Sequence, residues 1–565
     1  MTDKIKKHKW VIMLAFAIGV ISVAPQLYFA FFNSDFSGIH MFGTDAEHHY
    51  LARIQEVRDG YASLGNVFLP NKDQPYLMMG GGEVIAAILG KILFLDTVEF
   101  NLLSKFVFPF VIFLLIYFFV YKIFASRSIA IITASMAFFG SDLTSGPSAI
   151  MELFQFKSSA IGFLAHTRPI NPQISAIFLF TCLYLLFKIL YDTKGISLKL
   201  PILFGVISGL AVYIYIYVWS FLAIVIALYF FYFLYEKNKG YIKKFLYIIF
   251  IHSFVTIPYW INFFQARSHP DYIDSAMRQG LVSSHEFVLG MWLVISLIAV
   301  LFFWPDEYRR AKKFLLFVVI ALWIATNQQI ISGIMVQQAH YHWNITKPVL
   351  VSIIVSALFV YSMRRFVKIK KIITLAVILS VLVLFYHGVL SQISAYEYLY
   401  PRYLEYQKYS DVVLYFSENY ASEQNIFSTH VASVFLSVYT KHNAPNNPFS
   451  VYYLNSREYF SKLLFLEYKL IGIEPEVAGD IMRTSKCAVV KRVFGIYYRE
   501  QYGDCNALPD EIIDGLESSY KSFYNLSYAD IFEDLRIDFV VWDKISIPGL
   551  RQVHNINDEF IIFST

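Results

Sequence analysis

Eleven apolar runs, of which two (128–141 and 313–327) are short, dominate the sequence and leave few folds open to it. A helix needs about 20 apolar residues to cross the hydrocarbon core of a bilayer, and a water-soluble domain has no use for repeated runs of this kind. Hydrophobic residues make up 57% of the 565 residues. The sequence therefore predicts an all-α polytopic membrane protein with about eleven transmembrane helices. The runs fall near residues 10–32, 103–124, 128–141, 172–191, 201–219, 220–235, 245–264, 286–304, 313–327, 347–363 and 371–389.

The basic residues predict how these helices are oriented. Cytoplasmic connections of membrane proteins carry an excess of lysine and arginine, and here the basic residues fall in alternate connections. We therefore expect a cytoplasmic N-terminus and an extracytoplasmic C-terminus. The six basic segments contain Lys4 to Lys9; Lys122 and Arg127; Lys194 and Lys199; Lys237 to Lys244; Arg309 to Lys313; and Arg364 to Lys371. The outside connections are then 33–102, 142–171, 265–285, 328–346 and the chain after about residue 390.

The chain changes character after residue 390, where helical and strand-like patterns alternate. Residues 411–419 have the pattern of a helix, and residues 426–429 and 539–542 have that of buried strands. We expect a transmembrane domain at 1–390, with a long first external loop at 33–102, and a small extracytoplasmic α/β domain at 391–565. Cys487 and Cys505 lie in the second part, where they either form a disulfide or remain two free thiols.

The first external loop carries two carboxylates, Asp45 and Glu47, directly after the first apolar run. The apolar residues that follow recur at helical spacing, with charged residues such as Arg53 and Glu56 on the other side. This pattern predicts an amphipathic helix along the membrane surface, with its charged side exposed. Thr44 and Glu47 fit a capping box, in which Glu47 reaches back to a backbone amide. Asp45 is then free in the first turn, where the helix N-terminus favours the ionised carboxylate that a general base requires. The alternative is a surface aspartate that only complements the helix dipole.

Ionisable residues gather at the outside edges of the predicted helices, and His252 is the main one expected inside a helix. A proton-coupled transporter keeps carboxylates near the middle of the membrane. An enzyme with a lipid-linked substrate needs them at the interface, where the lipid head group lies, so the distribution favours an enzyme. The edge residues are Asp45, Glu47, Asp142, Glu152, His166, Arg168, Arg267, His269, Asp271, His340 and His342.

An acidic residue just after the first span, followed by an interfacial helix, resembles the first external loop of GT-C membrane glycosyltransferases. That family includes protein O-mannosyltransferases, aminoarabinose transferases and oligosaccharyltransferases, and the likeness extends to the whole predicted architecture. The resemblance implies that Asp45 acts as catalytic base or organises the acceptor, with Glu47 as second choice. Asp142, in Gly140-Ser-Asp142, matches a second acidic position that binds a divalent metal in oligosaccharyltransferases. Here a single aspartate occupies the position and not an acidic pair. It is therefore open whether Asp45 and Asp142 bind a divalent cation such as Mg²⁺ or Mn²⁺ at all.

The resemblance also implies the reaction, inverting transfer from a polyprenyl-phosphate sugar. Because the acceptor motif Trp-Trp-Asp of oligosaccharyltransferases is absent, transfer of a single sugar is favoured. The donor phosphate needs cationic partners near the membrane edge. Arg168 is the first candidate, in a segment from His166 to Gln173 that two prolines stiffen, and Arg267 and Lys347 follow. For each cation the alternative is a side chain that merely reaches the lipid head groups.

A second polar loop spans residues 327–342. Its side chains Gln328, Gln329, His340 and His342 suit sugar hydroxyls or a phosphate. The alternatives are a metal held by the two histidines and ordinary hydrogen bonding within the loop.

These patterns lead to one main hypothesis, a membrane glycosyltransferase with its site on the extracytoplasmic side. Its partners would be a polyprenyl-phosphate sugar, the lipid bilayer and a glycan, lipid or protein acceptor, with no nucleic acid. The alternatives are a glycolipid or polysaccharide transporter, flippase or polymerase, and a GT-C-like scaffold that has lost catalysis.

Overall fold

The computed structural model describes residues 2–43, 46–140, 142–144, 146–192, 197–367, 369–543, 550–556 and 559–564. Within these ranges, eight helical segments are long and apolar enough to cross a membrane, as predicted for a polytopic helical protein. They are His8–Phe32 of α1 (Thr2–Phe32), α4 (Thr97–Phe124), α7 (Gln173–Tyr191), α9 (Ile216–Tyr235), α10 (Lys239–Arg267), Asp306–Ser332 with α13 (Arg309–Thr326), Ala339–Phe366 with α16 (Ser352–Phe366), and Lys370–Asn419 with α17 (Lys370–Glu405).

The other three predicted runs coincide with shorter apolar helices. These are α5 (Arg127–Phe139), α8 (Lys199–Ile214) and α12 (Met291–Phe302), of 13, 16 and 12 residues. Each is shorter than the roughly 20 residues that a perpendicular span requires. The structure therefore confirms the helical, multi-span character of the chain, while the expected number of eleven spans is not confirmed.

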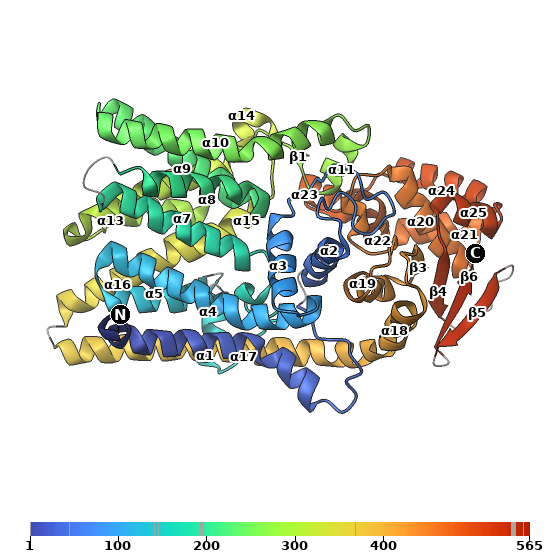
Figure 1. Cartoon of the computed structure of the whole chain (residues 1–565), viewed down its shortest axis with the longest axis horizontal. Coiled ribbons are helices and arrows are strands. Elements are labelled where there is room, and N and C mark those ends of the chain that lie inside the picture. The colour runs from blue at the N-terminus through green and yellow to red at the C-terminus, as the bar shows by residue number, and fades with distance from the viewer. Residues whose placement is uncertain are drawn as a thin grey trace.

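The basic connections meet at one end of the bundle. The Arg364 guanidinium donates to the Tyr308 hydroxyl at 3.0 Å and to the Ser126 hydroxyl at 3.2 Å, which joins three connections. Lys122 and Asp192 form an ion pair at 2.6 Å between two more helix ends. Figure 1 shows the N-terminus at this same end, far from the C-terminal region. Basic segments that are far apart in the sequence thus lie at the same end of the bundle.

The helix predicted after the first span is α2 (Glu47–Asp59), which packs between α3 (Gly81–Ile92) and α19 (His430–Tyr439). The prediction of an exposed charged side is wrong, because two of its charged residues are buried in ion pairs. Arg53 Nε lies 2.5 Å from Glu83 Oε1, and Lys72 Nζ lies 2.8 Å from Glu56 Oε1. These pairs fix α2 inside the protein, so it does not lie freely along a membrane surface.

The predicted capping box, with Thr44 as the helix cap and Glu47 three residues later, differs from the structure in where the helix begins. Ala46, in a left-handed conformation, directly precedes the helix, and Glu47 is its first residue. Thr44 and Asp45 lie outside the described residues. Glu47 does reach back to the chain before the helix, where Gly43 N–H donates to its Oε2 at 2.6 Å.

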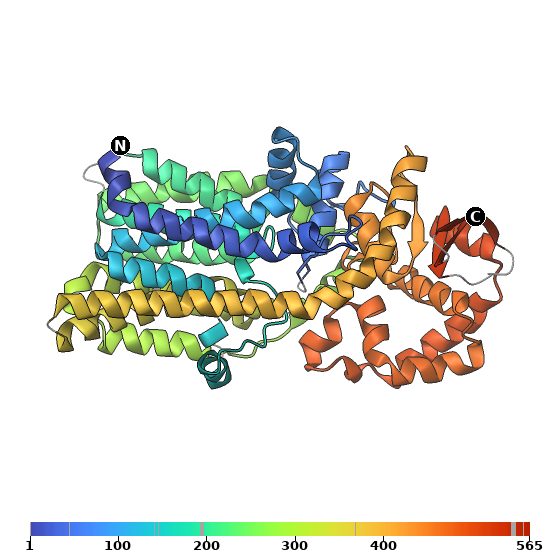
Figure 2. The same ribbon diagram turned by 90° about the horizontal axis from the view of Figure 1, so that it is seen from below.

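Beyond α17, the chain forms helices around a four-stranded sheet of order β3-β4-β6-β5. The predicted helix and strands are present as α18 (Ser410–Asn419), β3 (Ile426–Ser428) and β4 (Phe539–Asp543), joined by β5 (Arg551–Ile556) and β6 (Phe560–Ser564). β3 runs parallel to β4, and the other neighbours are antiparallel. Figure 2 shows α17 running along the bundle and leading the chain into this region. The larger helices around the sheet are α20 (Arg457–Leu470), α21 (Pro475–Thr484), α24 (Asp510–Tyr524) and α25 (Tyr528–Leu535).

Strands β3, β4 and β6 are buried on both faces of the sheet, whereas the edge strand β5 is mostly exposed. Side chains alternate along a strand, and in β6 Phe560 and Ile562 enter the large core that continues into the bundle. Ile561 and Phe563 enter a second core among the C-terminal helices. This double burial explains why the strands read as continuous apolar runs.

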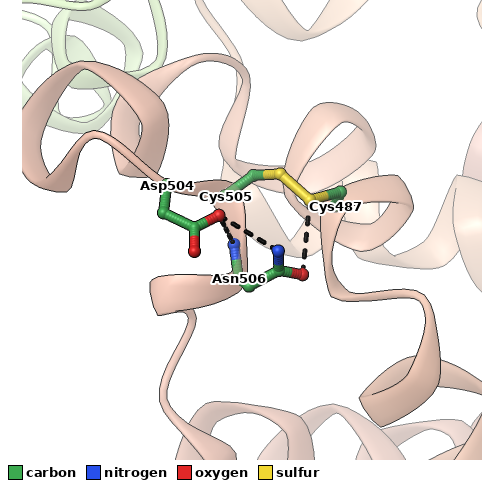
Figure 3. Close-up of a disulfide and its surroundings, with 4 residues drawn as sticks. All are labelled: Cys487, Asp504, Cys505 and Asn506. Atoms are coloured by element: carbon green, nitrogen blue, oxygen red, sulfur yellow. Dashed lines mark hydrogen bonds between the residues drawn. A yellow bond between two sulfur atoms is a disulfide. The ribbon is translucent and has the colours of Figure 1, made fainter.

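A disulfide joins Cys487 in α22 (Lys486–Val489) to Cys505, near which Asp504 and Asn506 form a hydrogen-bonded turn (Figure 3). Of the two alternatives left open by the sequence, the structure shows the paired one.

Candidate functional site

A cavity of about 380 Å³ lies at the end of the bundle opposite the basic connections. Its walls come from the start of α2, the end of α5, residues 162–168, Pro172, and the segment that leads into α16. That last segment includes a π-helical stretch, His342–Val351, and such stretches are frequent at functional sites. The cavity thus brings together parts of the chain that are far apart in the sequence, at one end of the helix bundle.

Glu47 is the described carboxylate in the cavity wall. Its Oε1 accepts from Asn101 Nδ2 at 2.8 Å and lies 2.7 Å from Lys105 Nζ. Its Oε2 accepts from the Gly43 amide. Lys105 is fully buried and also donates to the Thr167 carbonyl at 3.1 Å. Both oxygens of Glu47 are therefore engaged, and the carboxylate balances a buried ammonium between α2 and α4.

Two cations line the same cavity, Arg168 and Lys347. Arg168 Nε donates to the Asn171 carbonyl, and its guanidinium lies 5.9 Å from the centre of the Tyr50 ring. Lys347 Nζ lies 3.5 Å from the centre of the Trp343 ring. Phosphate oxygens are recognised by such cations at partly desolvated sites. The pair therefore gives the cavity the chemistry of an anion site.

Two predicted histidines also line the cavity. His166 stacks on Phe138 with ring centres 4.3 Å apart, and burial lowers the pKa of its imidazole to about 4. It is therefore neutral at neutral pH and adds no positive charge. His340 stacks on Tyr217 at 4.6 Å and hydrogen-bonds with the Tyr215 hydroxyl. Both imidazoles thus present polar edges beside an aromatic wall.

Gln173 and Asp142 lie next to the cavity without forming its wall. Gln173 is buried, and its Nε2 donates to the Thr167 carbonyl at 3.1 Å, the acceptor that also binds Lys105. Asp142 is exposed at the start of the 3₁₀ turn Asp142–Thr144 and interacts electrostatically with Lys347. Gln173 therefore helps to hold the Thr167 carbonyl beside Lys105, and Asp142 lies on the side of the cavity where Lys347 is.

Four other predicted site residues lie outside the cavity wall. Arg267 is exposed at the last turn of α10. Gln328 donates to the Ile334 carbonyl at 2.7 Å, and Gln329 to the Glu286 carbonyl at 2.9 Å, which is ordinary loop hydrogen bonding. His342 lies in a helical segment, where it does not share a face with a residue two positions away, so His340 and His342 make no metal pair.

The residues present do not favour a metal in this cavity. The ammonium of Lys347 lies near Asp142, where the family resemblance would place a divalent cation. Among the described residues, the one cluster with metal-ligand spacing is Cys487, Asp504 and Cys505, and its two cysteines are paired in the disulfide. Asp45, the other carboxylate of the expected metal site, lies outside the described residues, so a metal bound by Asp45 and Asp142 stays a prediction.

Sequence reasoning did not identify Asn101 and Lys105, which hold Glu47, or Trp343 and Asn344 in the cavity wall. Lys105 had a usable signal, because a lone lysine inside an apolar helix must have a buried partner. Trp343 and Asn344 had none, since nothing in their local pattern separates them from other residues at a membrane edge.

No protein-family model and no curated protein sequence matches this chain. Its function must therefore be argued from the cavity and the bundle.

Proposed function

We propose that this chain is an integral membrane glycosyltransferase that moves a single sugar from a polyprenyl-phosphate donor to an acceptor. The observation that carries the proposal is the cavity at one end of an apolar bundle, lined by the cations Arg168 and Lys347 and by the carboxylate Glu47. A lipid-linked phosphate needs an apolar route for its chain and positive charge at the membrane edge for its head group.

We place the cavity on the extracytoplasmic side. The basic connections gather at the opposite end, and such connections face the cytoplasm in membrane proteins. A disulfide in the C-terminal region suits an oxidising compartment. In this arrangement α5, α8 and α12 complete eleven membrane-embedded helices, and residues 391–565 form the extracytoplasmic domain.

In the proposed reaction, Asp45 takes the proton of the acceptor hydroxyl as the oxygen attacks the anomeric carbon. The bond from that carbon to the phosphate oxygen breaks, and the electron pair leaves with the polyprenyl phosphate. Arg168 and Lys347 stabilise the negative charge on this leaving group. We assign the base role to Asp45, which is two positions from each of the cavity residues Gly43 and Glu47, because Glu47 is already engaged by Lys105.

Substituting the two cavity cations is expected to weaken donor binding. Arg168→Gln and Lys347→Gln each remove a charged hydrogen-bond donor, which corresponds to about tenfold to hundredfold weaker binding of polyprenyl phosphate. Titration of purified protein in nanodiscs with polyprenyl phosphate measures this directly. Arg267→Gln is the matched control, since this exposed arginine lies outside the cavity wall. Unchanged affinity in both cavity variants would refute the proposed phosphate site.

A further inference from the structure

A second cavity, of about 290 Å³, lies in the C-terminal region. Its walls come from His430 at the start of α19, from residues 445–452, from α20 and from residues 490–499. Three cations line it, Lys491, Arg492 and Arg499, and none of its described lining residues is acidic. The charged residues that line this cavity are therefore all positive.

The charges of these cations are only partly balanced. Arg492 is paired with Glu467 behind the wall. Arg499 pairs with Glu500 at 3.0 Å, but its side chain is 61% exposed, and exposed pairs of this kind contribute little energy. Among the described residues, Lys491 has no carboxylate within ion-pair distance. An anionic group in the cavity would meet at least one uncompensated positive charge.

The remaining wall residues suit a polar ring. Phe449, Tyr452 and Phe460 contribute aromatic surface. The side-chain amides of Asn446 and Asn447 are buried and already donate within the protein, to the Ser428 carbonyl at 2.7 Å and to the Ser437 hydroxyl at 3.3 Å. Small-molecule sites combine apolar and aromatic walls with a few polar groups that fix orientation. The aromatic rings match the apolar faces of a sugar ring, and the cations match an anionic substituent on it.

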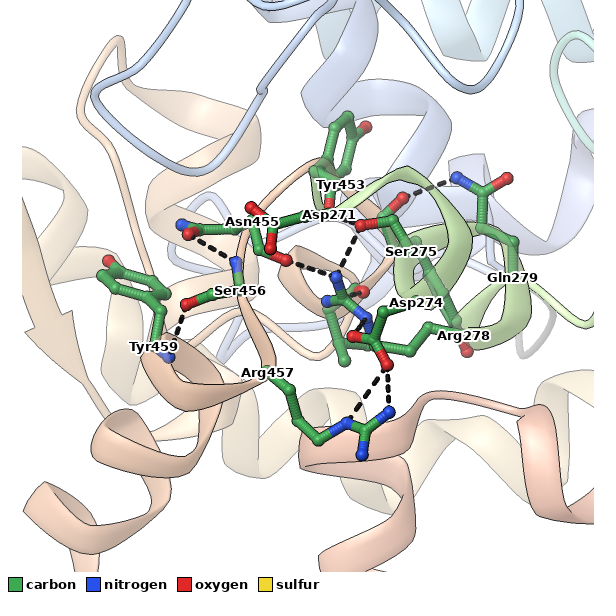
Figure 4. A network of polar contacts seen from close by, with 12 residues as sticks. Asp271, Asp274, Ser275, Arg278, Gln279, Tyr453, Asn455, Ser456, Arg457 and Tyr459 are labelled. Atoms are coloured by element: carbon green, nitrogen blue, oxygen red, sulfur yellow. Dashed lines mark hydrogen bonds and ion pairs between the residues drawn. The ribbon is translucent and has the colours of Figure 1, made fainter. Parts of the chain in front are cut away.

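The walls are held in place before any ligand binds. Arg278, buried at the end of α11 (Tyr272–Arg278), donates to the Val451 carbonyl at 2.7 Å, and its own carbonyl accepts from Ile496 N–H at 3.0 Å. Gln279 Nε2 donates to the Tyr452 carbonyl at 2.6 Å. Figure 4 shows Arg278 and Gln279 within this network, which also ties Asp274 to Arg457. One short helix thus braces two walls of the cavity.

Phe449 connects the two cavities. It lines the second one, and its ring stacks on His49 of α2 with centres 4.5 Å apart and planes within 10°. Its ring centre also lies 5.0 Å from that of His48. Because α2 begins at Glu47 in the wall of the first cavity, the first turn of this helix separates the two sites.

We infer that the second cavity binds an anionic saccharide and holds the acceptor beside the transfer site. The acceptor role rests on the proposed function, whereas the binding site itself does not. Lys491 and Arg499 recognise the carboxylate or phosphate of the ligand, and the aromatic rings contact its sugar ring.

Removal of the two cavity cations tests the site. The full chain, purified in nanodiscs, is titrated with a glucuronate-containing disaccharide, with glucose 1-phosphate and with neutral cellobiose, which separates carboxylate, phosphate and neutral sugar recognition. We expect at least one anionic probe to bind more tightly than cellobiose. Lys491→Ala with Arg499→Ala should weaken that binding by about tenfold or more.

Lys521→Ala with Arg551→Ala is the matched control, since both side chains are exposed and lie outside the cavity. Retained binding in this control and lost binding in the cavity variant would support the site. Equal binding in wild type and cavity variant, tighter binding of cellobiose, or no binding of either anionic probe would overturn it. Asp45→Asn should lower the rate of transfer by about 10²- to 10⁴-fold but keep probe binding, so failure of the saccharide site and failure of the transferase proposal give different results.

Discussion

Asp45→Asn is expected to lower kcat by about 10²- to 10⁴-fold, the usual contribution of a general base. The amide has nearly the size of the carboxylate but does not accept the proton of the acceptor hydroxyl. Donor affinity should change little, because the proposed phosphate partners are Arg168 and Lys347. Turnover of a polyprenyl-phosphate sugar by purified protein, measured together with donor binding, checks both expectations.

This variant also separates an enzyme from a transporter. A flippase or transporter built on the same bundle binds the glycolipid without proton abstraction at Asp45. Full activity of the Asp45→Asn protein would therefore remove the base assignment. Loss of donor binding together with turnover would also contradict it, since that pattern indicates a binding role.

Glu47→Leu is expected to destabilise the protein by about 3–5 kcal/mol, because it leaves a buried ammonium without its partner. The partner is Lys105, which is fully buried at 2.7 Å from the carboxylate. The substitution also removes the acceptor of the Asn101 amide. Unfolding in a denaturing detergent series, compared with wild type, measures the loss.

The double variant Glu47→Leu with Lys105→Met is the matched control. Replacing both members of a buried pair by apolar residues is often close to neutral, so stability should largely return. Transfer activity should return with it, because the proposed reaction gives Glu47 no chemical step and only the structural role of pairing with Lys105. A stable double variant without activity would instead give Glu47 a catalytic role.

Much of the fold could be predicted because it follows from local patterns. Every apolar run became a helix, since the bilayer selects for runs of this kind. The strands at Phe539 and Ile426 were recognisable because both faces of the sheet are buried. The run at 128–141 is already short in the sequence, as α5 is in the structure. The number of full spans could not be predicted because the runs at 201–219 and 286–304 are longer than the helices α8 and α12 that they form.

The errors around α2 have a common physical origin. Periodicity placed Arg53 and Glu56 on an exposed side, but a charged residue is readily buried when a distant segment supplies its partner. The partner of Arg53 is Glu83 and that of Glu56 is Lys72. Nothing in the sequence around α2 indicates either pair.

The candidate site was predictable in part. The sequence identified Glu47, His166, Arg168 and His340, which the structure brings into one cavity. Asp45 lies outside the described residues, so its role stays a prediction.

The proposed function depends most on which side of the membrane the cavity faces. Asp73 in the first external loop and Lys237 in a basic connection are both exposed, and a single cysteine at either position can be labelled with a membrane-impermeant maleimide in intact cells. We predict labelling of Asp73→Cys in intact cells and of Lys237→Cys only after the membrane is opened. The reverse pattern would put the cavity in the cytoplasm and contradict the proposed extracytoplasmic transferase.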